Sequence, residues 1–193
     1  MRPYTNNNTL CLILLIFIIP FYSHSASLNY IFKSGSDGYN TFRIPSLVTT
    51  SSGVVLAFAE GRKNSSSDSG DIDLVLKRSL DGGNSWGDMI IIRDDGLNVC
   101  GNPSPVIDER NGKIFLLSTW NKGEDSESEI INMKSMDTRR VYLMSSEDEG
   151  LTWSKPKEIT ESVKKPNWTW YATGPVHGIQ IKKGKRKGRM IVA

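Results

Sequence analysis

Residues 79–86 read SLDGGNSW, and residues 146–153 read SEDEGLTW. Both octapeptides follow the pattern Ser-x-Asp-x-Gly-x-x-Trp, and they begin 67 residues apart, at Ser79 and at Ser146. A motif that returns at a long, fixed spacing indicates a repeat architecture. The segments that surround each octapeptide therefore define the unit that is repeated.

Short segments with alternating or continuous apolar character surround both octapeptides, and such segments are typical of β-strands. Tight turns such as SSG and ERNG separate them. We expect an all-β chain of four-stranded antiparallel units in tandem, which are the blades of a β-propeller. The expected strands are residues 43–50, 54–60, 71–79 and 88–93, then 102–108, 113–120, 140–146 and 155–160, then 177–183 and 189–193. We predict no amphipathic helix after the N-terminal segment.

This topology predicts on which face of the propeller each segment lies. If the first strand of a blade starts at the top, the second ends there, and the turn between the third and fourth strands lies at the bottom. Arg43, Arg62 and the loop at residues 63–70 are then at the top, and so are Asn102 and His177, which begin the next two blades. Both octapeptide turns fall on the opposite face.

The octapeptides could be catalytic or metal sites, but a structural role accounts for them better. The aspartate can accept hydrogen bonds from its own turn backbone, and the glycine can adopt a positive φ. The tryptophan can pack between strands as an anchor. The residues with this predicted role are Ser79, Asp81, Gly83 and Trp86, and Ser146, Asp148, Gly150 and Trp153.

The composition excludes few classes of protein, but the net charge limits which partners are expected. The chain has 193 residues, enough for one domain, and a formal net charge of +3, which argues at most weakly for a polyanion partner. The basic stretch KKGKRKGR at residues 182–189 contains Gly184 and Gly188 and is flanked by expected strands. A solvated hairpin tip is favoured over a nucleic-acid patch, and we expect no nucleic-acid partner.

The N-terminal segment differs from the rest. Arg2 precedes an apolar run at residues 10–22, and small residues follow at 23–27. We predict a signal peptide at residues 1–26, cut after Ser25 or Ala26, and export to the periplasm, the cell surface or the medium. An uncleaved membrane anchor is the alternative, but the run is short for a span and no cationic flank follows. The domain then comprises residues 27–193, with no membrane span after cleavage.

The two cysteines and the acidic residues near residue 70 argue against two other sites. Cys11 lies in the predicted signal peptide, so Cys100 has no disulfide partner, and we expect a buried small residue rather than a nucleophile. Asp68, Asp71 and Asp73 lack the glycine and glutamate of an EF-hand loop. We place Asp71 and Asp73 on the polar face of a strand, while Asp68 lies in a loop where nothing local needs an anion. No metal or cofactor is expected.

One long charged connection, residues 120–137, joins the second and third strands of the second unit. The topology places it over the top of the propeller. Loops of this length in compact domains are usually functional or disordered, and the sequence leaves both interpretations open.

Three further stretches stand out beside the two octapeptides: FRIP at residues 42–45, EGR at 60–62 and WTWYATGPVHGIQ at 168–180. Taken together, these stretches resemble the exo-α-sialidases (neuraminidases), specifically the bacterial retaining kind, in which the octapeptide is called an Asp box. The resemblance covers residues 30–193. An Asp box alone also occurs in non-catalytic propellers, whereas FRIP at this distance upstream is specific. The resemblance implies a six-bladed propeller with its active site at the top centre, of which this chain supplies about two and a half blades.

The resemblance also implies roles for four residues. Arg43 matches the first member of an arginine triad that binds the carboxylate of sialic acid, and Arg62 matches a second active-site arginine of the same pocket. Asp68 matches the acid/base aspartate. Asn102 stands where many members have an aspartate near the pocket for the N-acetyl group.

The chemistry of sialic acid agrees with these roles. A guanidinium group is permanently charged and matches a carboxylate with two parallel hydrogen bonds. A carboxylate nucleophile beside that bound carboxylate would be repelled, which gives a reason for a tyrosine nucleophile. The acid/base must be protonated when it meets the leaving oxygen. Because an ordinary aspartate has a pKa of about 3.9, the pKa of Asp68 would have to be raised by burial or by nearby anions, the substrate included.

The nucleophilic tyrosine, its glutamate and two further arginines of the family pattern find no matching motif here, and neither Tyr171 nor Arg139 lies in one. We expect the N-terminal part of a sialidase that releases terminal sialic acids from glycoproteins, glycolipids or oligosaccharides with retention, and no activity of this chain alone. Two alternatives remain open. One is a non-catalytic Asp-box propeller that binds glycans or proteins, and the other is a trans-sialidase or related lyase-type enzyme.

Overall fold

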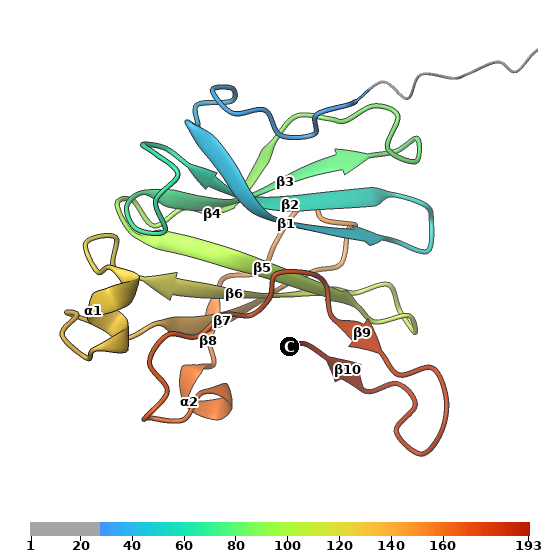
Figure 1. Ribbon diagram of the computed structural model, residues 1–193. Helices are drawn as coiled ribbons and strands as arrows, with labels where there is room; N and C mark the ends of the chain where they lie inside the picture. The colour runs from blue at the N-terminus through green and yellow to red at the C-terminus, as the bar shows by residue number, and fades with distance from the viewer. Residues whose placement is uncertain (1–27) are drawn as a thin grey trace, which may run out of the picture.

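A computed structural model describes residues 28–193, so the predicted signal peptide lies outside the described residues. Antiparallel four-stranded units follow one another along the chain, as predicted (Figure 1). The first unit has β1 (Thr41–Thr49), β2 (Val55–Arg62), β3 (Ile72–Ser79) and β4 (Ile90–Arg93). The second has β5 (Val99–Ile107), β6 (Ile114–Asn121), β7 (Arg140–Ser146) and β8 (Lys157–Glu158). A hairpin of β9 (Ile179–Gln180) and β10 (Met190–Ile191) begins a third.

Two short helices, α1 (Glu127–Ile131) and α2 (Thr160–Val163), were not predicted. Each is about one turn long, too short to produce a helical repeat of apolar residues. In α1 the start is set locally, because Ser126 caps the backbone of Glu129 while the Glu129 side chain returns to the Ser126 backbone. None of the helices among residues 28–193 is long and apolar enough to cross a membrane.

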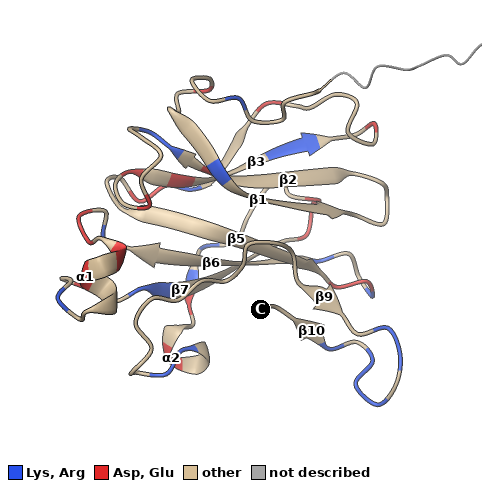
Figure 2. Cartoon of the chain, in the orientation of Figure 1, with Lys and Arg blue, Asp and Glu red and all other residues tan. Residues whose placement is uncertain are grey.

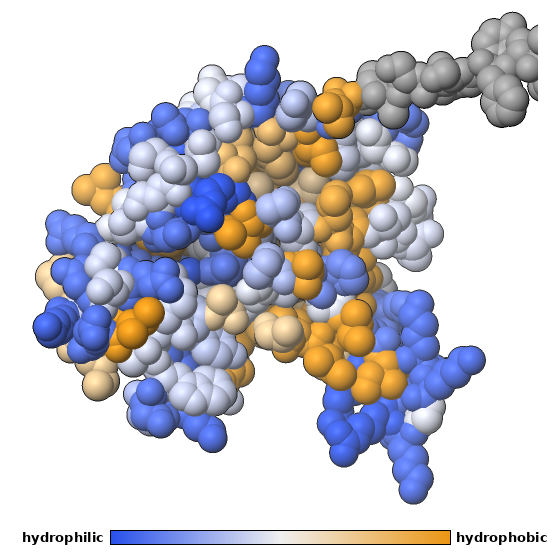
Figure 3. All heavy atoms as spheres, viewed as in Figure 1, coloured by the Kyte–Doolittle hydropathy of each residue, from blue (hydrophilic) through white to orange (hydrophobic). Residues whose placement is uncertain are grey.

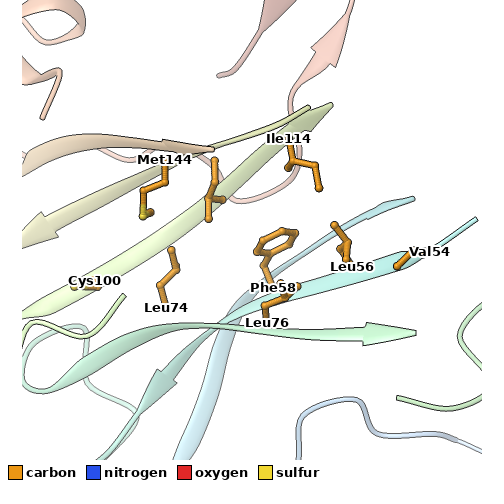
Figure 4. Packing of buried hydrophobic residues seen from close by; sticks show 9 residues of the cluster. Val54, Leu56, Phe58, Leu74, Leu76, Cys100, Ile114 and Met144 are labelled. Atoms are coloured by element: carbon orange, nitrogen blue, oxygen red, sulfur yellow. The ribbon is translucent and has the colours of Figure 1, made fainter. Parts of the chain in front are cut away.

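The main core lies between the first two units. Alternate residues of facing strands, such as Leu56 and Phe58 on β2 and Ile114 and Leu116 on β6, point into one cluster (Figure 4). This is the period-2 pattern of the sequence turned into a packed layer. Cys100 lies in the same cluster, fully buried and free, as predicted, and burial raises the pKa of its thiol to about 12. The two sheets are joined by a single parallel bridge, Ile72 to Val99.

The inner strands β1 and β5 carry the same irregularity at the same height. Their register shifts between Arg43 and Ser46 and between Gly101 and Ser104. In each, the residue before a proline has a positive φ, 53° at Ile44 and 50° at Asn102. For a β-branched residue such a φ is a genuine outlier. A β-bulge re-aims the side chains around it, so these two bulges determine where the top of each blade directs its polar groups.

Each octapeptide turn is organised around its own serine and aspartate. In the first, Asp81 Oδ1 accepts from Ser79 Oγ (2.7 Å) and from the Ser85 backbone (2.9 Å), and Gly83 has φ 96°. In the second turn, Asp148 makes the same two contacts, with Ser146 and Thr152, and Gly150 has φ 85°. These contacts serve the turn itself. Among residues 28–193 no group of acidic, histidine or cysteine side chains is arranged to hold a metal ion.

Asp73 lies on a strand, β3, as expected, but its side chain is fully buried. Residues 30–40 fold over that face of the first unit. Tyr39 Oη donates to Asp73 Oδ2 (2.6 Å), and Lys63 Nζ lies 3.1 Å from the same oxygen. Burial raises the pKa of Asp73 despite these two partners. The contact between Lys63 and Asp73 also anchors the loop that starts at Lys63.

His177 does not lie at the top beside Asn102, which corrects the prediction. The residue level with Asn102 is Thr173, whose hydroxyl donates to the Asn102 carbonyl (2.8 Å). The first strand of the third unit, β9, begins at Ile179, two residues later than the start of the strand expected at 177–183. His177 instead lines a hollow of about 710 Å³ that is also lined by residues at the far ends of β1 and β5.

The loop between β9 and β10 is the exposed hairpin tip that the sequence predicted. Residues 182–187 are all exposed, and Figure 2 shows positive charge gathered there. In Figure 3 this loop is a hydrophilic projection away from the body of the molecule. Its like charges are well hydrated in this position, and they disfavour strand-to-strand association.

Candidate active site

A cavity of about 210 Å³ lies at the top of the first two units. It is framed by both bulges, the end of β2, the loop that follows β2, the start of α1 and the segment before β9. The structure thus brings the four sequence-predicted site residues together around one space. The lining residues are Arg43, Ile44, Glu60, Arg62, Asp68, Val99, Asn102, Glu127, Arg139 and Trp170.

Arg43 projects from the bulge of β1, and its side chain is 42% exposed. Nη1 donates to the Ser66 carbonyl (3.0 Å) and to Asp68 Oδ1 (3.0 Å). Its second terminal nitrogen makes no hydrogen bond to residues 28–193. A guanidinium group carries five N–H donors, so most of its capacity to bind an oxyanion is unused.

Arg62, at the end of β2, is the fully buried counterpart of Arg43. Nε donates to Glu60 Oε2 (3.1 Å), and Nη1 donates to the carbonyls of Ser66 and Ser67, both at 2.6 Å. Nη2 donates to Asp68 Oδ1 at 2.7 Å. Arg62 therefore fastens the serine-rich loop over the cavity, and Glu60 offsets the cost of burying its charge.

Asp68 is about half exposed and lies between the two arginines. Burial acts to raise its pKa, but the hydrogen bond and charge of Arg62, followed by those of Arg43, outweigh burial and hold the pKa below its ordinary value. The sequence argument required a raised pKa for an acid. In the structure the pKa of Asp68 is lowered instead, because the guanidinium groups of Arg62 and Arg43 both contact its carboxylate.

Glu60 was missed at the sequence level. Its side chain is buried between the units, where Oε1 accepts from the Asn102 backbone N–H (2.8 Å) across to the bulge of β5. Gly101 makes room for this contact, since a Cβ there would lie 2.4 Å from Glu60 Oε1. Strand alternation in EGR places Glu60 and Arg62 on one side of β2, and that signal could have revealed the pair.

Arg139 was also missed, although it is 3% exposed and lines the cavity. Its guanidinium group donates to Asn102 Oδ1, to Thr119 Oγ1 (3.0 Å) and to Asn121 Oδ1 (2.9 Å). Cζ lies 3.8 Å from the centre of the Trp170 ring, a cation–π contact. Burial lowers the pKa of Arg139 to about 10, so it is protonated at neutral pH.

Sequence alone cannot separate Arg139 from its neighbour. Arg140, the next residue, pairs on the surface with Asp137 and Glu158. Both arginines directly precede the apolar part of β7, and only the direction of each side chain distinguishes them. Trp170 belongs to the stretch that carried the family resemblance, but its contact with Arg139 depends on the fold.

The long connection between β6 and β7 lies over the top, as the topology predicted. Glu127, the first residue of α1, lines the cavity. Asp125 holds the return of this connection through the backbone N–H groups of Met136 (2.8 Å) and Asp137 (3.0 Å). The segment is therefore an ordered part of the cavity wall.

The blades and this cavity define a propeller-type protein whose site, at one end of its inner strands, is lined by three arginines and three carboxylates. Comparison with known proteins identifies the family. Residues 53–193 match the family described as BNR repeat-like domain, and the chain belongs to it. This agrees with the sialidase resemblance of the Asp boxes and of FRIP.

Two curated relatives and one solved structure show how far the similarity extends. An "Exo-alpha-sialidase" of Aspergillus fumigatus (strain Af293) is 37% identical over 165 residues, which are 77% of this chain and 40% of the relative. A "Sialidase" of Bacteroides fragilis (strain YCH46) is 35% identical over 164 residues, 78% of this chain and 30% of that protein. The structure of "Hadza microbial sialidase Hz136" superposes with a TM-score of 0.70 at 35% identity, covering 77% of this chain and 32% of that one.

These comparisons establish the sialidase-type propeller for the part of the fold that the chain contains. The chain spans about two fifths of the length of the Aspergillus fumigatus relative. Two complete units and the start of a third are consistent with that share.

Proposed function

We propose that this chain is part of an exo-α-sialidase that removes terminal sialic acids from glycoproteins, glycolipids or oligosaccharides with retention of configuration. The observation that carries the proposal is the meeting of Arg43, Arg62 and Asp68 at one cavity. A non-catalytic propeller that only binds glycans would not need an aspartate held between two arginines. The sialidase names of the relatives support the same activity.

In this proposal Arg43 binds the carboxylate of the sugar. It is the more exposed of the two predicted arginines, it lines the cavity, and most of its donors are unused. Arg62 keeps the loop of Asp68 in place and adds positive charge beneath it. A bidentate guanidinium–carboxylate pair is both strong and directional, which suits the recognition of an acidic sugar.

Asp68 acts as the acid and then the base. A substrate carboxylate on Arg43 competes with Asp68 for the same guanidinium group, which now lies 3.0 Å from the aspartate. The incoming negative charge and the lost contact both raise the pKa of Asp68. Substrate binding therefore prepares the acid, which explains how an aspartate with a low pKa in the structure can serve this reaction.

The nucleophilic tyrosine, its glutamate and two further arginines belong to the family pattern but have no counterpart among residues 28–193. We infer that the 193-residue chain alone has no sialidase activity. Release of a fluorogenic aglycone by the purified chain would contradict this.

The acid/base role is tested by Asp68→Ala in a full-length, active protein. Loss of a general acid should slow natural sialosides by about 10²–10⁴-fold. Aryl sialosides should slow much less, because their leaving groups need little protonation. Asp37→Ala is the matched control, since that aspartate is exposed and pairs with Lys77 away from the cavity. Equal losses on the two substrate types would refute the role of Asp68.

Export is proposed on the sequence of residues 1–26 alone. The mature protein is expected to begin directly after Ser25 or Ala26. N-terminal sequencing of protein recovered from outside the cell checks this, and retention of Met1 would contradict it.

A further inference from the structure

Arg139 is a buried cation with no carboxylate within ion-pair distance among residues 28–193, although twelve such pairs occur there. Its partners are the neutral side chains of Asn102, Thr119 and Asn121 and the ring of Trp170. Its Nε has no hydrogen-bond partner. Burying an arginine without a counter-ion is costly, so a role beyond stability is needed to account for it.

The hydrogen bonds of Arg139 determine the orientation of the Asn102 side chain. A guanidinium group can only donate, so the atom of Asn102 that faces it must be the amide oxygen. Thr119 Oγ1 accepts from Arg139 (3.0 Å) and donates to the same oxygen (2.8 Å). Two donors on Oδ1 therefore exclude the flipped amide.

The backbone of Asn102 is held as firmly as its side chain. Its N–H donates to Glu60, and its carbonyl accepts from Thr173. The amide nitrogen Nδ2, by contrast, finds no acceptor within the described part of the chain. Because Asn102 lines the cavity beside Arg43 and Asp68, this nitrogen and its two N–H bonds are left for the cavity.

We propose that Arg139 is a positioning residue of the site, which holds the Asn102 amide with its oxygen inward so that its N–H groups donate to an oxygen of an anionic sugar in the cavity. This inference rests on the proposed function for its ligand. An aspartate in place of Asn102 would instead accept hydrogen bonds and would pair with Arg139, neutralising its charge. The asparagine thus leaves N–H donors on this wall of the cavity, and no carboxylate of the described residues is in direct contact with Arg139.

A double-mutant cycle tests whether Arg139 acts through Asn102. In a full-length, active protein, Asn102→Ala and Arg139→Met should each raise the KM for an aryl sialoside about tenfold with little change in kcat, as for a contact made equally in ground and transition states. The double variant should lose no more than Asn102→Ala alone. Additive losses, or an unchanged KM in Arg139→Met, would overturn the inference.

Further variants separate positioning from a general effect of the charge. Arg140→Met removes the neighbouring surface arginine and should leave KM unchanged. Thr119→Val deletes the second donor to Asn102 Oδ1 without removing a charge, and a moderate increase in KM is expected. Arg139→Lys keeps the charge, but on a single donating nitrogen in place of the planar guanidinium fork, and should recover part of the loss. If Arg139→Lys restored KM fully while Thr119→Val had no effect, charge alone would be sufficient and positioning would be refuted.

A measurement without activity keeps this inference separate from the proposed function. The side-chain amide signals of Asn102 can be assigned in the NMR spectrum by their loss in Asn102→Asp. In Arg139→Met, or in Thr119→Val should the former not fold, these signals should shift and their two protons should exchange faster. Unchanged signals in a folded variant would overturn the positioning role. Titration with N-acetylneuraminate should then move the same signals in the wild type, and movement of other site signals without them would exclude the donor contact.

Discussion

The two Asp boxes have the same pattern and the same serine–aspartate hydrogen bonds, yet among residues 28–193 only the second packs into a core cluster with a neighbouring blade. Trp153 packs edge-on against Phe58 of the first unit, with ring centres 5.9 Å apart, and joins the main core cluster. Trp86, at the same position of the first box, belongs to neither core cluster of the described residues. The turn is therefore a local structure, whereas anchoring depends on the blade beside it.

Other contacts of the second box follow the same rule. Thr50 and Ser52 of the first unit donate to Glu149, and Arg78 Nε donates to the Glu149 carbonyl (2.9 Å). The first box receives only one long-range hydrogen bond from the described residues, from Asn29 to the Asn84 carbonyl (3.3 Å). Among the described residues, the second box therefore has more hydrogen bonds from outside its own turn than the first.

The largest test of this comparison is removal of the two tryptophans. Trp153→Ala should lower the free energy of unfolding by about 3 kcal/mol, as expected for a large aromatic at the edge of a core. Trp86→Ala should cost about 1 kcal/mol or less. Denaturant titration of both variants checks this. Equal losses would show that both tryptophans are anchored alike.

A smaller difference in the free energy of unfolding is expected between alanine substitutions at Gly83 and at Gly150. Both have a positive φ, so alanine should cost about 1 kcal/mol at either position. At Gly150 the new Cβ would also lie 3.0 Å from Leu76 Cδ2, whereas at Gly83 its nearest neighbour is Trp86 at 3.8 Å. Gly150→Ala should therefore cost about 1 kcal/mol more. Thermal unfolding of the pair measures the difference, and the reverse order would contradict the packing argument.

The smallest test uses pH. Hydrogen bonds from Ser85 and Ser79 lower the pKa of Asp81 to about 2, from an ordinary value of 3.8. A lowered pKa means that the stabilisation is present above the ordinary value and is lost as pH falls towards the lowered one. Asp81→Asn should therefore flatten the fall in stability between about pH 4 and pH 2.

Asp148 provides the comparison for this pH effect. Burial acts to raise its pKa, while hydrogen bonds from Thr152 lower it, and the net shift is downward. Asp148→Asn should also reduce the fall in stability at acid pH. Stability curves of the two variants, recorded from pH 5 to pH 2, should both be flatter than that of the wild type, and a wild-type slope in either would rule out a role for that turn's carboxylate.

Most of the strand order could be read from period-2 alternation and turn residues, because both are local. The errors lie where an element is short or where cover comes from distant residues. One-turn helices such as α1 carry no periodic signal, and β9 begins two residues later than its apolar pattern indicates. Asp73 alternates like a surface residue but is covered by residues 30–40.

The residues of the site also divide into those that the sequence predicted and those that only the fold revealed. FRIP, EGR and the serine-rich loop predicted the residues that now meet at the cavity, Arg43, Arg62 and Asp68. Glu60 and Arg139 emerged only when the two units were packed together, because both act on the bulge of β5 from other strands. The direction of the Asp68 pKa also depended on contacts that its own loop does not contain.

The sequence by itself determined the repeated unit, its turns and the face on which its arginines and aspartate lie, because alternation, glycine φ and chain direction are properties of neighbouring residues. Only the tertiary structure decided which Asp box is anchored, that Asp68 lies between two guanidinium groups, and that Arg139 orients the amide of Asn102. Those outcomes depend on distances between residues far apart in the chain, which burial and hydrogen bonding determine only when the blades pack together.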